Sequence, residues 1–512
     1  MLNFCEDDEQ RETVQKTVEG HKNEYKEIFY INNNGSQSNI YCSAKLRYPA
    51  TTQERLLIGT LKGKVSCLER NENIDCQNEF HSCHDMRARE VYFSYIPGDA
   101  EIISMDSFYR HQSIERSKCL VVGVTLILLK PNDSSAYEPQ HYFNIYIALE
   151  PGTEFDLDKL AQVCQHQRLD FAPYHLHHAE ILVNDIYETV FLLAGSDEKI
   201  HLFKGDNQQC FAEEPCKNYF PEFNAITGRV IWMHVKHCDG FKRLSAFGCD
   251  NGYLRVAYAD SKKNEIIQVW TMFIDGPITS VRLFTLTSEK ELISPSAEET
   301  SISPRPVLCE SSEINLLVTS AIEVAVVYLN IVEKGLNEMV VLDQSDHFDS
   351  VTCSCITDLD CDGNNEIILG TYGQELLTYK WNFSEKYACK KVSFYLACRK
   401  EFPKPIISTD CLDIIGDGMQ ELVVVSLTGI HILQHEVESA AEKLLEKIIR
   451  AYPDKYLPMF GENYEQKDKH LPMFSESYEQ KDKHLPMFSE SYEQKDKHLP
   501  MFSESYEQKD IF

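Results

Sequence analysis

Acidic side chains at regular spacing between residues 358 and 366 are the strongest candidates for chemistry in this 512-residue chain. The polar residues of the segment are Asp358, Asp360, Asp362, Asn364 and Glu366. Alternation turns the three aspartates toward one centre, Gly363 permits a sharp turn, and hard oxygen donors suit Ca²⁺. The bidentate glutamate of an EF-hand would fall at position twelve, which is Leu369. The segment therefore predicts either a Ca²⁺ loop, with the Asn364 carbonyl as a ligand, or a turn held by its own Asx hydrogen bonds.

A second acidic segment, Asp413 to Glu421, repeats the spacing further along the chain. Its third position is Ile415, whose side chain cannot coordinate a cation, so we expect a turn kept for its shape. Each segment runs directly into an apolar stretch, at residues 367–370 and 422–425. The pattern of spaced aspartates, glycine and glutamate before a buried strand resembles the FG-GAP repeat of β-propellers.

Other residues with catalytic or metal-binding potential do not assemble into a known motif. The sequence contains no Walker-type phosphate loop, G-x-S-x-G elbow or H-E-x-x-H pair. His175 and His177 would share one face of a strand, so a metal site there is conceivable, but no paired cysteines support zinc. Cys353, Cys355 and Cys361 also lack C-x-x-C spacing and are interpreted as structural. We expect no enzyme activity, and no required cofactor other than Ca²⁺ in the first interpretation of the loop.

The most basic stretch of the chain lies between residues 386 and 404. Its cationic residues are Lys386, Lys390, Lys391, Arg399, Lys400 and Lys404. On a chain with a net charge of −30, this stretch is the natural place for an acidic protein surface to bind. Val392, Phe394 and Leu396 alternate within it, so a strand with a charged outer face is the competing interpretation.

Composition narrows the class of protein. A hydrophobic content of 43% predicts a real core, and the net charge of −30 disfavours broad nucleic-acid or anionic-membrane surfaces. The acidic first nine residues do not resemble a secretory signal, and no stretch has the length of a membrane span. The 18 cysteines are then expected to be reduced core residues, which predicts a cytosolic protein.

The elements that must hold the acidic loops follow a weak internal repeat from about residue 36 to 435. Each unit is an apolar strand, a short turn and a second strand. The seven units are 56–59 with 64–68, 119–123 with 143–147, 190–194 with 200–203, 244–248 with 253–258, 316–319 with 324–328, 367–370 with 376–379, and 422–425 with 430–433. Paired strands at this spacing, with few helical patterns between them, predict an all-β, seven-bladed propeller of FG-GAP or WD40 type. Residues 38–46 are expected to complete the last blade and close the ring.

Four segments flank or interrupt the predicted propeller. Residues 1–35 are interpreted as a flexible acidic arm, and the Ser- and Glu-rich residues 286–313 as a disordered insertion. Residues 436–451 have the apolar stripe of an amphipathic helix, which either packs on the propeller or binds a partner. Residues 452–512 repeat Leu-Pro-Met-Phe and Tyr-Glu-Gln-Lys-Asp every 14 residues and predict a disordered tail.

Longer stretches of the sequence resemble the kaptin family, in order, from about residue 36 to beyond 435. The matching segments are 93–104, 150–158, 188–193, 358–366, 370–377 and 429–435. The first 30 or so residues, the tail repeats and the Ser- and Glu-rich insertion fall outside the resemblance. Ile415 departs from it, since kaptin-like chains have a small polar residue there.

The resemblance implies a non-enzymatic subunit of the KICSTOR complex, which recruits the GATOR complex to the lysosomal surface and restrains TOR complex 1 when nutrients are scarce. It also implies an alternative, association with actin filaments at lamellipodia and stereocilia. The expected partners are therefore other KICSTOR subunits and, through them, GATOR, or else actin, without nucleic acid or membrane insertion. A contact with actin through the small basic stretch should weaken steeply with salt, whereas an obligate scaffold interface should not.

Overall fold

The computed structural model describes most of one compact unit, which spans residues 1–447. The described residues are 25–32, 36–47, 54–70, 86–111, 118–131, 137–148, 156–206, 210–238, 240–287, 313–384, 391–436, 440, 441 and 445. The predicted tail at 452–512, residues 1–24 of the predicted arm and residues 288–312 of the insertion lie outside this part of the chain.

Seven four-stranded antiparallel sheets, here called blades 1 to 7, make up the described chain. The strands of each blade are given from inner to outer. Blade 1 consists of β2 (Ser43–Arg47), β3 (Glu54–Gly59), β4 (Val65–Arg70) and β5 (Met86–Val91), and blade 2 of β6 (Glu101–His111), β7 (Lys118–Pro131), β8 (Tyr137–Ile147) and β9 (Cys164–Leu169). Blade 3 consists of β10 (Pro173–Val183), β11 (Ile186–Gly195), β12 (Ile200–Gly205) and β13 (Phe211–Glu214). Blade 4 consists of β14 (Val230–Cys238), β15 (Lys242–Cys249), β16 (Tyr253–Asp260) and β17 (Glu265–Phe273). Blade 5 consists of β18 (Ile278–Phe284), β19 (Asn315–Ser320), β20 (Val326–Tyr328) and β21 (Met339–Val341). Blade 6 consists of β22 (Val351–Thr357), β23 (Glu366–Thr371), β24 (Glu375–Ser384) and β25 (Lys391–Glu401). Blade 7 consists of β26 (Ile406–Leu412), β27 (Glu421–Ser426), β28 (Gly429–His435) and β1 (Tyr25–Asn32).

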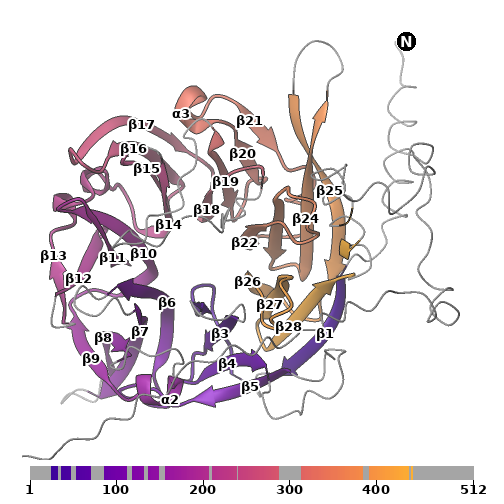
Figure 1. The fold of residues 1–512 in the computed structure, drawn as a ribbon. Helices are drawn as coiled ribbons and strands as arrows, with labels where there is room; N and C mark the ends of the chain where they lie inside the picture. The colour runs from indigo at the N-terminus through magenta and orange to yellow at the C-terminus, as the bar shows by residue number, and fades with distance from the viewer. Residues whose placement is uncertain are drawn as a thin grey trace, which may run out of the picture. The chain divides into compact units, whose positions relative to one another are not determined.

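The blades are arranged in a ring, with β6, β14, β18, β22 and β26 toward its centre (Figure 1). Each inner strand contacts the inner strands of both neighbouring blades, and β26 contacts β2, so the ring is closed. All seven strand pairs that the sequence predicts are the two middle strands of a blade. The predicted seven-bladed propeller is confirmed.

The hydrophobic core lies between blades, because each blade presents an apolar face to each neighbour. Between blades 3 and 4, for example, Leu192 packs with Phe220, Met233 and Phe247, and all four side chains are buried. Equivalent clusters fill the other junctions, including the junction of blades 7 and 1. Truncating such a side chain to alanine typically costs about 2–5 kcal/mol, so inter-blade packing contributes substantially to the stability of the ring.

The strand that closes the ring differs from the prediction. Tyr25–Asn32, within the predicted flexible arm, form β1 and pair with β28 as the outer strand of blade 7. Tyr25 is buried, and Ile28, Phe29 and Ile31 pack against the cluster between blades 7 and 1. The prediction that residues 38–46 close the ring is wrong, because Ser43–Arg47 form β2, the inner strand of blade 1.

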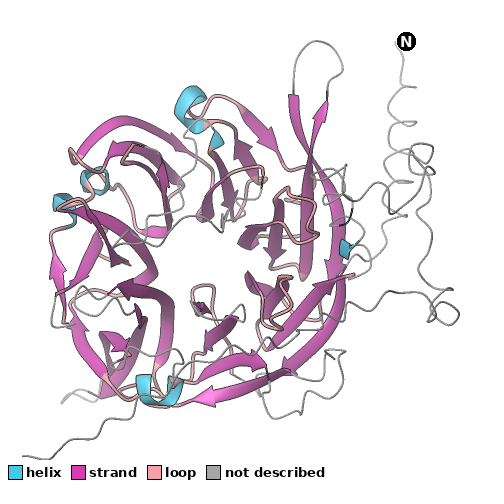
Figure 2. Ribbon diagram, in the orientation of Figure 1, coloured by secondary structure: helices cyan, strands magenta, loops and turns pink. Residues whose placement is uncertain are grey.

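Helical structure is sparse in the described residues (Figure 2). The helical segments are α2 (Leu157–Leu160), η2 (Cys216–Asn218), η3 (Pro221–Asn224) and α3 (Ile331–Lys334). Asp156 caps α2 by accepting hydrogen bonds from two backbone N–H groups of its first turn. Of the helix predicted at 436–451, Ala440, Ala441 and Leu445 are described and helical, and most of the remainder lies outside the described residues. Within the described residues, every helix is too short or too polar to cross a membrane.

Candidate functional site

The first acidic loop joins the inner strand β22 to β23 in blade 6. Carboxylate oxygens of Asp358, Asp360, Asp362 and Glu366 lie within 4.8 Å of one another. Gly363 makes this possible, since its φ of 89° reverses the chain where other residues would be strained. The structure thus brings all four predicted carboxylates together, and this donor set fits a hard divalent cation.

The same carboxylates also accept hydrogen bonds from the loop's own backbone. Asp358 accepts from the N–H of Gly363 at 2.9 Å, Asp360 from that of Asp362 at 3.1 Å, and Asp362 from that of Asn364 at 2.7 Å. Asn364 also forms an isolated antiparallel bridge with Thr287. The geometry therefore contains both the donor cluster of a Ca²⁺ loop and the hydrogen bonds of an Asx turn.

Lys380 on β24 brings a positive charge into this loop. Its ammonium nitrogen lies 2.5 Å from Asp360, whose side chain is buried. Glu366 is also buried, and desolvation together with the charge of Asp360 raises the pKa of its carboxyl to about 9. At neutral pH the loop therefore already holds a built-in cation and a protonated glutamate. A Ca²⁺ ion would have to compete with Lys380 for Asp360 and displace the proton of Glu366.

The second acidic loop joins β26 to β27 in blade 7 and is held mainly by its own backbone. Asp413 accepts from the N–H groups of Gly416, Asp417 and Gly418 at 2.6, 3.2 and 2.8 Å. Glu421 accepts from the N–H of Ile414 at 2.9 Å, and burial raises the pKa of its carboxyl to about 8. These contacts show how the loop keeps its shape although Ile415 offers no side-chain ligand.

The predicted basic stretch does not form one group of side chains in the described residues. Arg399 lies 2.5 Å from Glu375, with its guanidinium carbon 4.3 Å from the Phe348 ring centroid, and Lys400 donates to the Tyr25 carbonyl at 3.3 Å. Lys404 is exposed. Lys386, Lys390 and the side chain of Lys391 lie outside the described residues. Two of the described cations therefore already have partners inside the propeller, Arg399 a partner within blade 6 and Lys400 a partner on the outer strand of blade 7.

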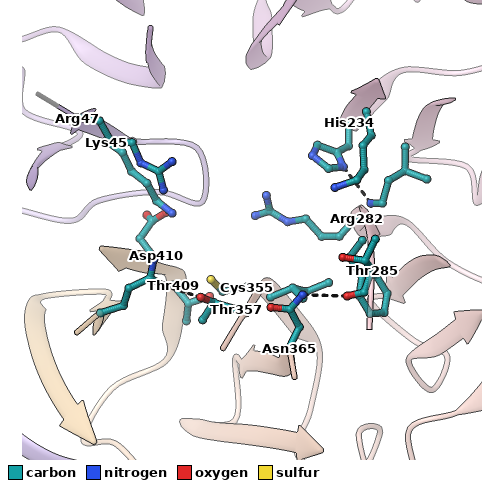
Figure 3. Close-up of a pocket in the computed structure, with 15 residues that line it drawn as sticks. Lys45, Arg47, His234, Arg282, Thr285, Cys355, Thr357, Asn365, Thr409 and Asp410 are labelled. Carbon is teal, nitrogen blue, oxygen red and sulfur yellow. Dashed lines mark hydrogen bonds and ion pairs between the residues drawn. The ribbon is translucent and has the colours of Figure 1, made fainter. Parts of the chain in front are cut away.

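A cationic cavity lies where inner strands of five blades meet, and the sequence motifs did not reveal it. It has a volume of about 410 Å³ and is lined by Lys45 and Arg47 of β2, Lys236 of β14, Arg282 of β18 and Asp410 of β26, among others. Figure 3 shows the guanidinium of Arg282 reaching toward the middle of this space. Four cationic side chains against one carboxylate make this a positive pocket in an acidic protein.

These cations come from three strands spread between residues 45 and 282, so no local spacing could indicate the cavity. The only available signal was their shared position on the inner strands of successive blades. Several of them also have contacts within the protein. Lys45 lies 3.4 Å from Asp410, Arg47 lies 2.6 Å from Glu54, and the Arg282 guanidinium carbon is 4.8 Å from the Trp232 ring centroid.

His234 lines this cavity, and the ring centroid of His177, one of the clustered histidines, lies 5.7 Å from that of His234. The Nδ1 atoms of His175 and His234 accept from the N–H groups of Met233 and Leu283 at 3.2 and 2.9 Å. Burial lowers the pKa of His175 and His177 to about 3, so both are neutral at physiological pH. His178 contacts Asp106 at 2.8 Å. Within the described residues, the groups of three or more possible metal ligands are confined to the two acidic loops.

An apolar groove of about 320 Å³ lies between blades 4 and 5, on strands β17, β19, β20 and β21. Phe273 and Met339 line it, with exposed fractions of 69% and 53%. Large apolar side chains at this exposure gain free energy when a partner covers them. The groove is therefore a surface suited to protein binding.

Comparisons with known proteins give a consistent result across the propeller. The sequence model of the family described as "KICSTOR complex protein kaptin" matches residues 25–445. A mouse protein named "KICSTOR complex protein kaptin" is 40% identical over 415 residues, which cover 81% of this chain and 89% of that protein.

Solved structures with a similar arrangement include BBS1N in complex with ARL6DN, soaked with mercury (TM-score 0.46, 8% identity) or with lead (TM-score 0.43, 9% identity). Each likeness covers 80% of this chain and 97% of the other chain.

Proposed function

This chain belongs to the family of the KICSTOR complex protein kaptin, and from that premise we propose that it is a non-enzymatic scaffold subunit of a KICSTOR-like complex. In this function it helps recruit the GATOR complex to the lysosome. It thereby negatively regulates TOR complex 1 when amino acids or glucose are scarce. The observation that carries the proposal is the extent of the match, because it runs through all seven blades and not through one motif.

The surface of the propeller supports a role in protein binding. Phe273 and Met339 stand on the outer strands of blades 4 and 5 and flank the apolar groove. Burying one such side chain contributes about 1.5–3 kcal/mol, and a few residues of this kind usually dominate an interface. We assign this groove to a neighbouring subunit of the complex.

The acidic loops support a structural role over a catalytic one. Glu366 and Glu421 have the raised pKa values that a general acid could use. Each, however, accepts a hydrogen bond from the backbone of its own loop, at 2.8 Å from Leu359 and 2.9 Å from Ile414. Carboxyls held in this way stabilise turns, which agrees with a scaffold.

The protein is expected to be cytosolic and to associate peripherally with the lysosomal membrane through its complex. The competing function is direct attachment to actin filaments at cell edges. That function would rely on the basic stretch, in which Arg399 and Lys400 already have partners inside the propeller.

Affinity purification of the tagged full chain at low and physiological salt separates the two functions. We expect KICSTOR subunits to co-purify stoichiometrically at both salt concentrations. The double substitution Phe273→Ser/Met339→Ser should weaken their recovery at least about tenfold, since tenfold corresponds to about 1.4 kcal/mol. Leu129→Ser is the matched control, because Leu129 is also exposed (54%) but lies on β7 of blade 2. Recovery of actin alone, lost at physiological salt, would replace the scaffold function with the cytoskeletal one.

A further inference from the structure

Two cysteines from neighbouring blades meet at the wall of the cationic cavity. Cys355 lies on β22 and Cys411 on β26, the inner strands of blades 6 and 7. Their sulfur atoms are 3.3 Å apart, although the residues are separated by 56 positions in the sequence. This contact spans the junction between two blades.

The two thiols differ in their access to solvent. Cys355 lines the cavity of about 410 Å³, whereas Cys411 is not among the residues that line it. Both side chains are otherwise buried, with exposed fractions of 8% and 2%. A small neutral molecule that enters the cavity therefore meets the sulfur of Cys355 first, with Cys411 directly behind it.

The surrounding charges favour the thiolate form of Cys355. The hydrogen bond with Cys411 and the positive charges of Lys45 and Arg282 outweigh burial and Asp410, and lower the pKa of Cys355 to about 7. Cys353 lies two residues away on the same strand, and burial raises its pKa to about 11. At neutral pH Cys355 is thus the reactive thiol of this strand, and Cys353 remains a protonated core residue.

We propose that Cys355 and Cys411 form a redox-sensitive dithiol, which a small peroxide entering the cavity converts into a disulfide between blades 6 and 7. A nucleophilic thiolate, a second thiol in contact and a polar entry path are the features of a reversible cysteine switch. The site depends on the geometry of the propeller alone, so it goes beyond the scaffold function proposed above.

The reaction has two steps. The Cys355 thiolate attacks one peroxide oxygen, an S–O bond forms as the O–O bond breaks, and the departing hydroxide takes a proton and leaves as water. The sulfur of Cys411 then attacks the sulfenic sulfur of Cys355, an S–S bond forms, and the hydroxyl leaves as water with the Cys411 proton. The two thiols lose two electrons in total, and hydrogen peroxide is reduced to two molecules of water.

The disulfide requires only a small movement. The sulfurs must approach from 3.3 Å to roughly 2.05 Å. The bond would close a long loop through β23, β24 and β25 and would fix blade 6 to blade 7. We therefore expect the oxidised protein to unfold at a higher urea concentration than the reduced protein.

Titration of the folded full chain with hydrogen peroxide tests the proposal. Free thiols are alkylated after each addition, and peptides are identified by mass spectrometry. The Cys355–Cys411 cross-link is expected before the exposed Cys210 is oxidised, and dithiothreitol should reverse it. Cys411→Ser should leave Cys355 as a sulfenic acid that dimedone traps, whereas Cys353→Ala should still form the cross-link.

Oxidation of Cys210 while Cys355 and Cys411 remain alkylatable thiols would overturn the proposal. A cross-link that forms equally fast in 6 M urea would overturn it as well, because the folded geometry would then contribute nothing. Since the wild-type protein alone distinguishes these outcomes, the test does not depend on the variants folding.

Discussion

Lys380 determines how the acidic loop of blade 6 is charged. Its ammonium group reaches Asp360 at 2.5 Å from the second strand beyond the loop, β24. An internal lysine and a bound Ca²⁺ ion would stabilise the same carboxylates, so each makes the other less favourable. This competition turns the two interpretations of the loop into a measurable difference.

Lys380→Met should make the loop depend on calcium. Without the ammonium group, Asp360 and its neighbouring carboxylates repel one another, so the variant should be less stable than wild type in chelator. Millimolar Ca²⁺ should raise its melting temperature more than that of wild type, and saturation at 100 times Kd would supply about 2.7 kcal/mol. Thermal unfolding of both proteins with Ca²⁺ and with chelator measures the difference.

Asp360→Asn in the Lys380→Met background is the control for that experiment, since it removes a ligand and should reduce the response to Ca²⁺. If Ca²⁺ changes the melting temperature of neither Lys380→Met nor wild type, the loop is an Asx turn without a metal.

Glu366 and Glu421 should make the protein less stable as the pH rises. Their folded-state pKa values of about 9 and about 8 exceed the ordinary value of 4.5, so the folded state binds more protons between these limits. Their stabilising contribution is complete below pH 4.5 and is lost as the pH rises through the folded-state values. In the double variant Glu366→Gln/Glu421→Gln, the loss of stability between pH 6 and pH 9 should shrink by about 6 kcal/mol, because each group contributes about 1.4 kcal/mol per pH unit up to its folded-state pKa. Urea unfolding at several pH values tests this, and parallel curves for the two proteins would contradict it.

At the residue scale, the sequence predicted only those groups of side chains that lie close together along the chain. The carboxylates of the first loop fall within nine residues, and the structure brings all four together. Lys380, Arg282 and Lys45 reach their sites from other strands or other blades, so their roles depend on ring geometry. No one-dimensional pattern carries that information.

At the element scale, the position of β1 in the ring also could not be predicted from local sequence patterns. Residues 25–32 and 43–47 are both short stretches with strand-like composition, and either could have completed the last blade. The structure assigns β1 to blade 7 and β2 to the inner edge of blade 1, where β2 contacts β6 and β26. The pairs of middle strands were predictable because each is apolar on both faces. Which of the two N-terminal segments becomes the outer strand of blade 7 is decided only by how the ring closes.

Two N-terminal deletions should therefore have very different effects. Removal of residues 1–24 should leave the melting temperature nearly unchanged, since β1 begins at Tyr25. Removal of residues 1–32 deletes β1, exposes the edge of β28 and uncovers the apolar cluster that Ile28, Phe29 and Ile31 help to cover. We expect the longer deletion to lower the melting temperature by at least about 10 °C or to cause aggregation. Equal melting temperatures for the two deletion proteins would show that β1 is dispensable.

At the scale of the whole molecule, net charge and local charge have opposite signs. The chain carries a net charge of −30, yet inner strands of several blades direct Lys45, Lys236 and Arg282 into one cavity. Composition correctly described the protein as acidic, but it could not describe where the cations gather. The ring imposes that arrangement, because residues on every inner strand converge on one axis.

Ring closure also predicts that the blades unfold together. Every described junction between blades contains an apolar cluster. The N-terminal strand β1 pairs with β28 in blade 7, so among the described residues each blade packs against both of its neighbours. Buried thiols report on different blades, with Cys119 in blade 2, Cys249 in blade 4 and Cys398 in blade 6. In pulsed alkylation under reducing conditions across a urea gradient, these three thiols should become reactive at one common midpoint. The exposed Cys210 should react at every urea concentration and serves as the control. If Cys398 became reactive at clearly lower urea than Cys119, blade 6 would open separately, and closure by β1 would not make the ring cooperative.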